Sequence, residues 1–360
     1  MADALKLIRK RVKHSLAAAV ARVAVLPLSR RPRSMAEVAG LQPRSILAIR
    51  SDRVGDLLVS APLLAAMHAK WPDARIALVA GPKNQAVLEG LPFVEAAPLW
   101  GPGPSSWSAV TRWLSVHRFD IAVSLRAEVL SGALLAAASR APVRLVTHAT
   151  HLTGAFNAVA GPEIRHHVTR YCRTAELLGV PCAEQRPVYL VPATARVAAD
   201  AVIRAVRPAA PRPVVGVQVP NTSTSRHARR AWPLDRIVDL TRFLTSKGVH
   251  VVLCGFGPEL QAAALVQAEV PAAVVAPPLR LGLLAALLET FDVFVSGFTG
   301  PLHLADAVGC PTVTIGSNLL AEYWRPIGPR HRLLAAETAA EVPREGVFDA
   351  VLALLSRGGA

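Results

Sequence analysis

The chain has 360 residues, 52% of them hydrophobic, and a formal net charge of +15. This length fits two domains of ordinary size, and the hydrophobic content excludes a disordered chain. No run of 18 uninterrupted apolar residues occurs, which argues against a membrane-spanning helix. The charge suits anionic lipid headgroups or an acceptor with phosphate or carboxylate groups, although an arginine- and alanine-rich composition explains part of it. Because no recognisable nucleic-acid-binding module is present, we expect no nucleic-acid partner.

The four cysteines, Cys172, Cys182, Cys254 and Cys310, do not have the spacing of a metal site. Cys254 and Cys310 lie inside or beside predicted strands, where a free cysteine behaves as a small core residue. We therefore expect no metal cofactor and a protein of the reducing cytoplasm.

Residues 1–44 are predicted to form a basic amphipathic extension and a linker. The first 33 residues hold nine Lys or Arg and a single Asp, and apolar residues from Leu5 to Val20 recur three to four apart. This spacing predicts a helix with one apolar face, typical of helices that lie in a membrane interface. A secretory signal is disfavoured because Arg22 interrupts the apolar region, and a solvated basic extension is the other alternative. We expect a peripheral protein on the inner face of the membrane, bound through residues 1–33.

From residue 45 onward, short apolar runs alternate with amphipathic segments. Strands that alternate with helices indicate a parallel, doubly wound sheet. Residues 45–205 are therefore predicted to form a Rossmann-like domain on the acceptor side. The predicted strands are residues 46–49, 75–80, 121–124 and 143–146, and the predicted helices are residues 57–70, 129–138 and 168–178.

A proline-rich connection between Pro187 and Pro213 leads into a second unit, residues 206–360. The α/β fold that we predict therefore has two Rossmann-like domains facing a central cleft. Ligands of such sheets bind at the carboxyl ends of the strands, so the loops there hold the candidate site residues. The predicted strands of the second unit are residues 214–219, 249–254, 293–295 and 312–315, and its predicted helices are residues 233–247, 301–309 and 344–356.

The first candidate loop, Arg50 to Asp56, follows the first predicted strand and precedes a helix. It lacks the G-x-G-x-x-G spacing of dinucleotide-binding proteins, which argues against a nicotinamide enzyme. A carboxylate at Asp56 suits a catalytic base, whereas its place at a helix start also suits a helix cap. Asp52 is the alternative base. Arg53 and Arg126, each in a loop that follows a strand, are candidates to bind an anionic acceptor.

Two loops of the second unit suit a phosphorylated ligand. Thr222, Ser223, Arg229 and Arg230 combine hydroxyl and guanidinium groups ahead of a predicted helix, and guanidinium groups bind phosphate well. A solvated basic loop is the alternative explanation.

The second of these loops, within residues 296–311, turns from strand 293–295 into a helix at Thr299 and Gly300. Unpaired amide N–H groups and the helix dipole form an anion site at such a turn. His303, in the first helical turn, is a candidate donor to the anion or a structural residue that a neighbouring loop satisfies.

These motifs resemble, in order and spacing, those of glycosyltransferase family 9, the lipopolysaccharide heptosyltransferases. The resemblance covers residues 45–345 and implies the GT-B fold. The family usually has Asp-Thr-Gly-Pro-Met-His-Leu-Ala at the second helix start, where this chain has Phe298 in place of the Asp. The resemblance implies that Asp56 is the catalytic base and that Arg230 neutralises the diphosphate leaving group. It also implies that Glu259 binds the nucleotide ribose hydroxyls, although a simple Gly-Pro turn with an exposed Glu is the alternative.

The resemblance leads us to expect an inverting glycosyltransferase that moves a sugar, heptose in this family, to a cell-envelope glycan or glycolipid. The donor is expected to be a nucleotide-diphosphate sugar, ADP-heptose by the resemblance, without a further cofactor. One alternative is a UDP-, dTDP- or GDP-hexose donor, which Phe298 favours. The other is a non-catalytic relative that binds a glycan or a membrane.

Overall fold

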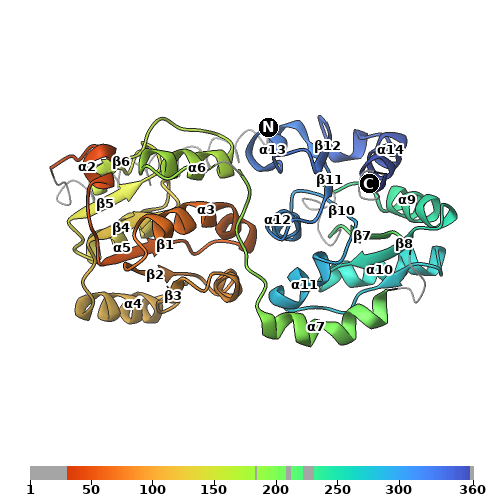
Figure 1. Cartoon of the computed structure of the whole chain (residues 1–360), viewed down its shortest axis with the longest axis horizontal. Coiled ribbons are helices and arrows are strands. Elements are labelled where there is room, and N and C mark those ends of the chain that lie inside the picture. The colour runs from red at the N-terminus through yellow and green to blue at the C-terminus, as the bar shows by residue number, and fades with distance from the viewer. Residues whose placement is uncertain (1–30, 183–184, 208–211, 222–230, 357–360) are drawn as a thin grey trace, which may run out of the picture.

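The computed structural model describes residues 31–182, 185–207, 212–221 and 231–356, and it has two α/β halves side by side (Figure 1). Each half contains a sheet of six parallel strands with helices packed against it. The predicted extension at residues 1–30 lies outside the described residues.

The first sheet has the strand order β3-β2-β1-β4-β5-β6. Its central strands are buried along almost their whole length, because helices cover both faces of a parallel sheet. The strands are β1 (Ser45–Ile49), β2 (Arg75–Val79), β3 (Val94–Ala96), β4 (Ile121–Ser124), β5 (Val143–Val146) and β6 (Ala158–Val159). The helices are α2 (Met35–Ala39), α3 (Val54–Lys70), α4 (Pro104–Val116), α5 (Leu130–Ala138) and α6 (His167–Leu177), with short 3-10 helices η2 (Gln85–Gly90) and η3 (Thr153–Ala155).

The second sheet has the strand order β12-β11-β10-β7-β8-β9. Its strands are β7 (Val214–Gln218), β8 (His250–Cys254), β9 (Val274–Val275), β10 (Val293–Ser296), β11 (Thr312–Ser317) and β12 (His331–Ala336). The helices are α7 (Ala193–Val206), α9 (Leu234–Ser246), α10 (Pro258–Glu269), α11 (Leu281–Leu288), α12 (Gly300–Ala307), α13 (Asn318–Trp324) and α14 (Arg344–Leu355), with the 3-10 helix η4 (Ala339–Glu341).

Both sheets have the same topology. Read from one edge in each half, the order of the strands is third, second, first, fourth, fifth and sixth, which is the Rossmann order. The order reverses between β1 and β4 in the first sheet and between β7 and β10 in the second. The predicted fold class, two Rossmann-like domains in a GT-B arrangement, is confirmed.

The two halves share an apolar interface. Leu63 and Leu64 of α3 and Leu304 and Ala305 of α12 belong to one buried hydrophobic cluster that extends through both halves. Helix α7 follows the connection from α6 and packs against α11 of the second half (Figure 1). The predicted domain boundary between residues 205 and 206 stays a prediction.

Candidate active site

The first turns of α3 and α12 touch each other across the interface. Helix α3 follows β1 and helix α12 follows β10, so each begins at the reversal point of its sheet. A Cβ atom added to Gly55 would lie 2.9 Å from Cδ2 of His303 and 3.4 Å from Cα of Gly300. Ligands bind at reversal points, so this contact brings together the two positions in the molecule best suited to hold them.

A pocket of about 360 Å³ contains the predicted residues of the first half. Its wall is strongly charged, and Trp324 contributes to it from the second half. The charged lining residues are Arg50, Arg53, Arg126, Arg170, Asp52, Asp56 and Glu128. The structure thus places Arg53, Asp56 and Arg126 around one cavity. A base and two acceptor-binding residues that act on the same acceptor need to lie this close together.

Asp56 is held by an ion pair and does not cap its helix. The N-cap of α3 is Arg53, which has no side-chain capping bond, and Asp56 lies within the first turn of the helix. Its Oδ1 atom is 3.2 Å from Nη2 of Arg50. Burial and the Asp52 carboxylate raise the pKa of Asp56 above its ordinary value, while Arg50, Arg126 and Arg53 oppose the rise. A carboxylate with a raised pKa is a stronger proton acceptor than an exposed aspartate.

Asp52, the alternative base, is bound more tightly. Its Oδ1 atom accepts a 2.8 Å hydrogen bond from Nε of Arg50, and its Oδ2 atom is 3.5 Å from Nη1 of Arg126. With a guanidinium group on each oxygen, Asp52 is better placed to orient these arginines than to accept a proton.

Arg50 is the buried centre of this network, and its role was not predicted from the sequence. Its side chain is only 3% exposed, and Nη1 donates to the carbonyl oxygen of Leu125 and to the hydroxyl of Tyr171, 2.6 Å away. The Tyr171 hydroxyl also donates to the Leu125 carbonyl. Because Tyr171 lies 121 residues after Arg50, no local pattern could have revealed this contact.

Three of the predicted donor-binding residues, Thr299, Gly300 and His303, lie at the start of α12. Thr299 is the N-cap, and its Oγ1 atom is 3.1 Å from Oγ of Ser296, while Gly300 begins the helix. His303 is 5% exposed, and burial, with a smaller effect of His166, lowers its pKa to about 4. His303 is therefore a neutral imidazole at physiological pH, able to donate one hydrogen bond.

Phe298 packs on the neighbouring strand. A Cβ atom added to Gly316 of β11 would lie 2.4 Å from Cε2 of Phe298, so the ring occupies the space above that glycine. The ring thus covers the end of β11 beside the start of α12, and it offers no hydrogen-bond acceptor there.

Glu259 lies in the first turn of α10, where two groups hold it. Its Oε2 atom accepts a 2.8 Å hydrogen bond from Nε2 of Gln218, at the end of β7, and a 3.0 Å bond from the amide of Phe256. Its predicted contact with ribose hydroxyls stays a prediction. Four other donor-side candidates, Thr222, Ser223, Arg229 and Arg230, lie outside the described residues.

Helix α6 connects the pocket to the second half. Nε2 of His166 is 2.8 Å from the carbonyl oxygen of Arg325, and the ring of His167 lies 3.9 Å from that of Trp324. Burial, with the nearby Arg170 and Arg50, lowers the pKa of His167 to about 3. The C-terminal end of α13, at Trp324, therefore closes the pocket against the start of α6.

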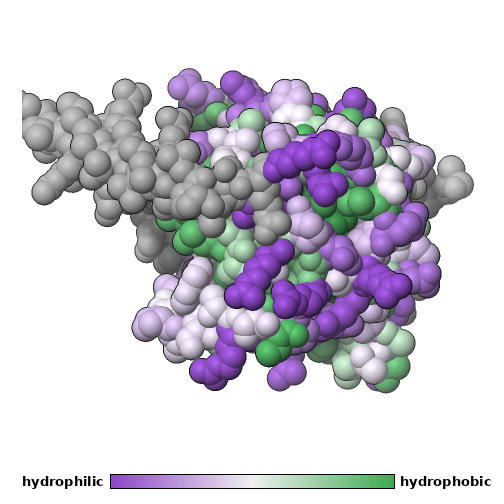
Figure 2. All heavy atoms as spheres, turned by 90° about the vertical axis from the view of Figure 1, so that its left-hand side faces the viewer, coloured by the Kyte–Doolittle hydropathy of each residue, from purple (hydrophilic) through white to green (hydrophobic). Residues whose placement is uncertain are grey.

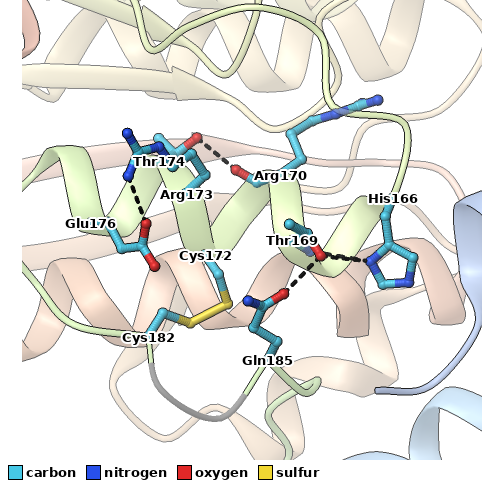
Figure 3. Close-up of a disulfide and its surroundings, with 9 residues drawn as sticks. All are labelled: His166, Thr169, Arg170, Cys172, Arg173, Thr174, Glu176, Cys182 and Gln185. Carbon is cyan, nitrogen blue, oxygen red and sulfur yellow. Dashed lines mark hydrogen bonds and ion pairs between the residues drawn. A yellow bond between two sulfur atoms is a disulfide. The ribbon is translucent and has the colours of Figure 1, made fainter. Parts of the chain in front are cut away.

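A disulfide joins Cys172 of α6 to Cys182 in the following connection (Figure 3). Close by, Oγ1 of Thr169 donates a 2.7 Å hydrogen bond to Gln185 (Figure 3). The sequence analysis did not predict this pairing, because a ten-residue separation carries no signal of its own. Cys254 and Cys310 are free and buried, as predicted.

Comparisons with known proteins show the family and the fold of the chain. The family model described as glycosyltransferase family 9 (heptosyltransferase) matches residues 107–348. The chain belongs to this family. The resemblance seen in the sequence is thereby confirmed, and with it the prediction that the chain is a glycosyltransferase. No curated protein matches the chain.

Solved structures of low sequence identity share the fold of this glycosyltransferase. A glycosyl transferase family 9 protein from Veillonella parvula DSM 2008 has a TM-score of 0.75 at 19% identity, covering 87% of this chain and 98% of its own. The E. coli ADP-heptose lps heptosyltransferase II has a TM-score of 0.71 at 20% identity, with 88% and 100% covered. E. coli heptosyltransferase WaaC with ADP-2-deoxy-2-fluoro heptose has a TM-score of 0.65 at 17% identity, with 86% and 99% covered.

The described part of the chain lacks a metal-binding cluster and a membrane-spanning helix. Its His, Cys, Asp and Glu residues form no group of three or more that could hold a metal ion. Among its helices, none has both the length and the apolar character needed to cross a membrane.

Proposed function

We propose that this family 9 glycosyltransferase moves heptose from ADP-heptose to an anionic glycan or glycolipid of the cell envelope, with inversion at the anomeric carbon. The observation that carries the proposal is the contact between the first turns of α3 and α12. In it, the start of α12, which is suited to a diphosphate, lies against Gly55, the neighbour in sequence of Asp56, a half-buried carboxylate with a raised pKa. The family description and the printed names of the similar structures favour heptose and ADP.

The proposed reaction is a single displacement. The acceptor hydroxyl oxygen attacks the anomeric carbon and forms the new glycosidic bond, while the bond from that carbon to the diphosphate breaks. Asp56 accepts the proton of the attacking hydroxyl. The charge that develops on the departing diphosphate is stabilised by Arg230, by the free amides at Thr299 and Gly300, and by a hydrogen bond from neutral His303. In this scheme the protein's own cationic and N–H groups carry the leaving-group charge, and we propose no cofactor.

The remaining predicted residues divide between the two substrates. On the acceptor side, Arg53 and Arg126 line the pocket, and their guanidinium groups suit a phosphate or carboxylate on the glycan. On the donor side, we propose that Thr222, Ser223 and Arg229 contact the diphosphate. We propose that Glu259, at the start of α10, binds the ribose hydroxyls.

A nucleotide panel tests the donor. We expect ADP to raise the melting temperature of the purified protein, and UDP, GDP and dTDP to have little effect at the same concentration. A ligand that binds only the folded state contributes about 2.7 kcal/mol at 100 times its dissociation constant. Differential scanning fluorimetry resolves such a shift. A response to none of the four diphosphates would reject the donor site.

A different nucleotide hexose is the second candidate donor, and Phe298 favours it. The ring on Gly316 is an apolar group next in sequence to the start of α12, and we propose that it suits a smaller or less hydroxylated sugar. A selective response to UDP, GDP or dTDP in the same panel would identify this alternative.

We also propose that residues 1–33 attach the enzyme to the inner face of the membrane, where such an acceptor would be met. Figure 2 shows that the outer end of the first half is covered mainly by hydrophilic residues. Smaller apolar patches lie between these hydrophilic residues (Figure 2), and the proposal depends on the N-terminal segment.

Deletion of residues 1–33 is expected to abolish flotation with liposomes that contain anionic lipid, because the segment holds nine basic residues and an apolar stripe. The full chain should float, and it should float less well at high salt. Equal flotation of the two proteins would contradict the proposal.

A further inference from the structure

Glu128 lines the same pocket as Asp56, but the proposed transfer gives it no role. It lies in the loop between β4 and α5, and β4 pairs directly with β1, whose loop carries Asp56. The two carboxylates therefore follow neighbouring parallel strands, at the same edge of the first sheet. Glu128 lines this pocket together with Arg53 and Arg126, the two predicted acceptor-binding residues.

A buried histidine holds Glu128. Nε2 of His148 is 3.0 Å from Oε1 of Glu128, and Nδ1 of His148 is 3.0 Å from Oγ1 of Thr147. A neutral ring satisfies both contacts when the Thr147 hydroxyl donates to Nδ1 and the Nε2–H donates to Glu128. His148 is 1% exposed, whereas the Glu128 side chain is 47% exposed. A fixed, buried ring thus orients a carboxylate that remains accessible from the pocket.

Glu128 is ionised wherever the enzyme works. The hydrogen bond from His148 lowers the pKa of Glu128 to about 2, against an opposing effect of burial. An ionised carboxylate only accepts hydrogen bonds, and its bonds to hydroxyl groups are short and strong. Glu128 is therefore suited to a ligand hydroxyl or to a ligand cation.

The surrounding charges decide between these two ligands. Arg126 and Arg170 line the pocket, and Nε of Arg170 is fixed by a 2.7 Å hydrogen bond to the carbonyl oxygen of Ile164. These guanidinium groups repel a cationic ligand and attract a phosphate or carboxylate. A ligand with only acidic groups would be repelled by Glu128. A sugar that carries both an acidic group and hydroxyls complements the whole wall.

We infer that Glu128 binds a hydroxyl group of an acidic acceptor sugar and that His148 is the residue that positions it. The inference rests on the proposed transferase function and deepens it, because it names the chemistry by which the acceptor is selected. A site that holds an acceptor for a substrate hydroxyl rejects analogues that lack the hydroxyl, since its polar group is then left unpaired. Glu128 would thus fix which sugar hydroxyl reaches Asp56.

Glycan binding without donor tests the inference. The probes are O-deacylated, heptose-free lipopolysaccharide and methyl glucuronide, titrated calorimetrically into the full chain. Glu128→Gln keeps the shape of the side chain but removes its charge, and we expect it to raise the dissociation constant about tenfold or more. Glu176→Gln is the matched control, because it removes an exposed carboxylate that pairs with Arg173 at 2.9 Å on the outside of α6 (Figure 3). This variant should bind as the wild type does.

The outcomes separate the subsite from the donor reaction. Equal glycan affinity of wild type and Glu128→Gln would overturn the inference, and so would a wild type that binds neither probe. If ADP still raises the melting temperature in that case, the transferase proposal stands without the subsite. If ADP fails and glycan binding depends on Glu128, the donor proposal is rejected and the subsite stands.

The positioning role of His148 has its own readout. In a folded His148→Phe variant, which keeps a ring but has no hydrogen-bond donor, we expect the pKa of Glu128, followed by carbon NMR, to rise from about 2 towards the ordinary carboxyl value. An unchanged pKa would overturn this role, even if the substitution lowers stability.

Discussion

Asp56→Asn is expected to lower the turnover number by about 10²- to 10⁴-fold, the usual contribution of a general base. Asparagine keeps the shape of the side chain but cannot accept the proton of the acceptor hydroxyl. The loss should appear in kcat at saturating donor and acceptor, measured by release of the nucleoside diphosphate.

The variant should remain folded, for an electrostatic reason. The pKa of Asp56 in the folded protein lies above its unfolded value, so the neutral form is favoured by folding. The ionised carboxylate therefore destabilises the fold at any pH above the folded pKa, and the neutral amide removes this cost. We expect the melting temperature of Asp56→Asn at pH 7 to equal or exceed that of the wild type.

The dependence of activity on pH follows from the same shift. The base works only when ionised, so kcat of the wild type should fall as the pH is lowered through the raised pKa of Asp56. Burial and the Asp52 carboxylate raise this pKa, while Arg50, Arg126 and Arg53 lower it.

Asp52→Asn is the control that separates the two candidate bases. It removes a carboxylate from the same loop, and it should shift the acid limb of the profile to lower pH without abolishing turnover, because it relieves the repulsion on Asp56. If Asp52→Asn were the inactive variant and Asp56→Asn the active one, the base would be Asp52.

The central strands and the loops after them were predictable from the sequence because their signals are local. Continuous apolar runs such as residues 121–124 and 293–295 are typical of parallel strands covered on both faces, and the strands observed there differ by at most one residue. The edge strands β6 and β9 have only two residues each, too few for any periodicity to appear.

The arrangement of the pocket could be predicted only in part. Loops after neighbouring parallel strands share one edge of a sheet, so a common site for Arg53, Asp56 and Arg126 followed from the topology. The partners that set their chemistry come from distant segments: Tyr171 reaches Arg50, and Trp324 closes the wall from the other half. Such contacts depend on how the helices pack in three dimensions. The spacing of residues along the sequence does not predict this packing.

The second large effect concerns the contact between the halves. Gly55→Val is expected to reduce kcat about 100-fold, because a displacement of about 1 Å between reacting groups has an effect of this size. A Cβ atom at this position would lie 2.9 Å from Cδ2 of His303 and 3.4 Å from Cα of Gly300, so valine would displace the buried His303 ring or the first turn of α12. The backbone of Gly55 is helical, so the substitution acts through this contact rather than through an unusual dihedral angle.

Gly161→Val is the matched control, because an added Cβ atom there would have no other atom within 4 Å. It should keep wild-type turnover.

ADP should still raise the melting temperature of Gly55→Val, since the proposed nucleotide site lies in the second half and each sheet keeps its own packing. Turnover of Gly55→Val within twofold of the wild type would mean that Asp56 and the α12 start need not meet in this geometry. The catalytic role assigned to the contact would then be wrong, although ADP binding would be unaffected. Loss of ADP binding together with turnover would instead place the nucleotide across both halves, so that the spacing of α3 and α12 governs donor binding as well as transfer.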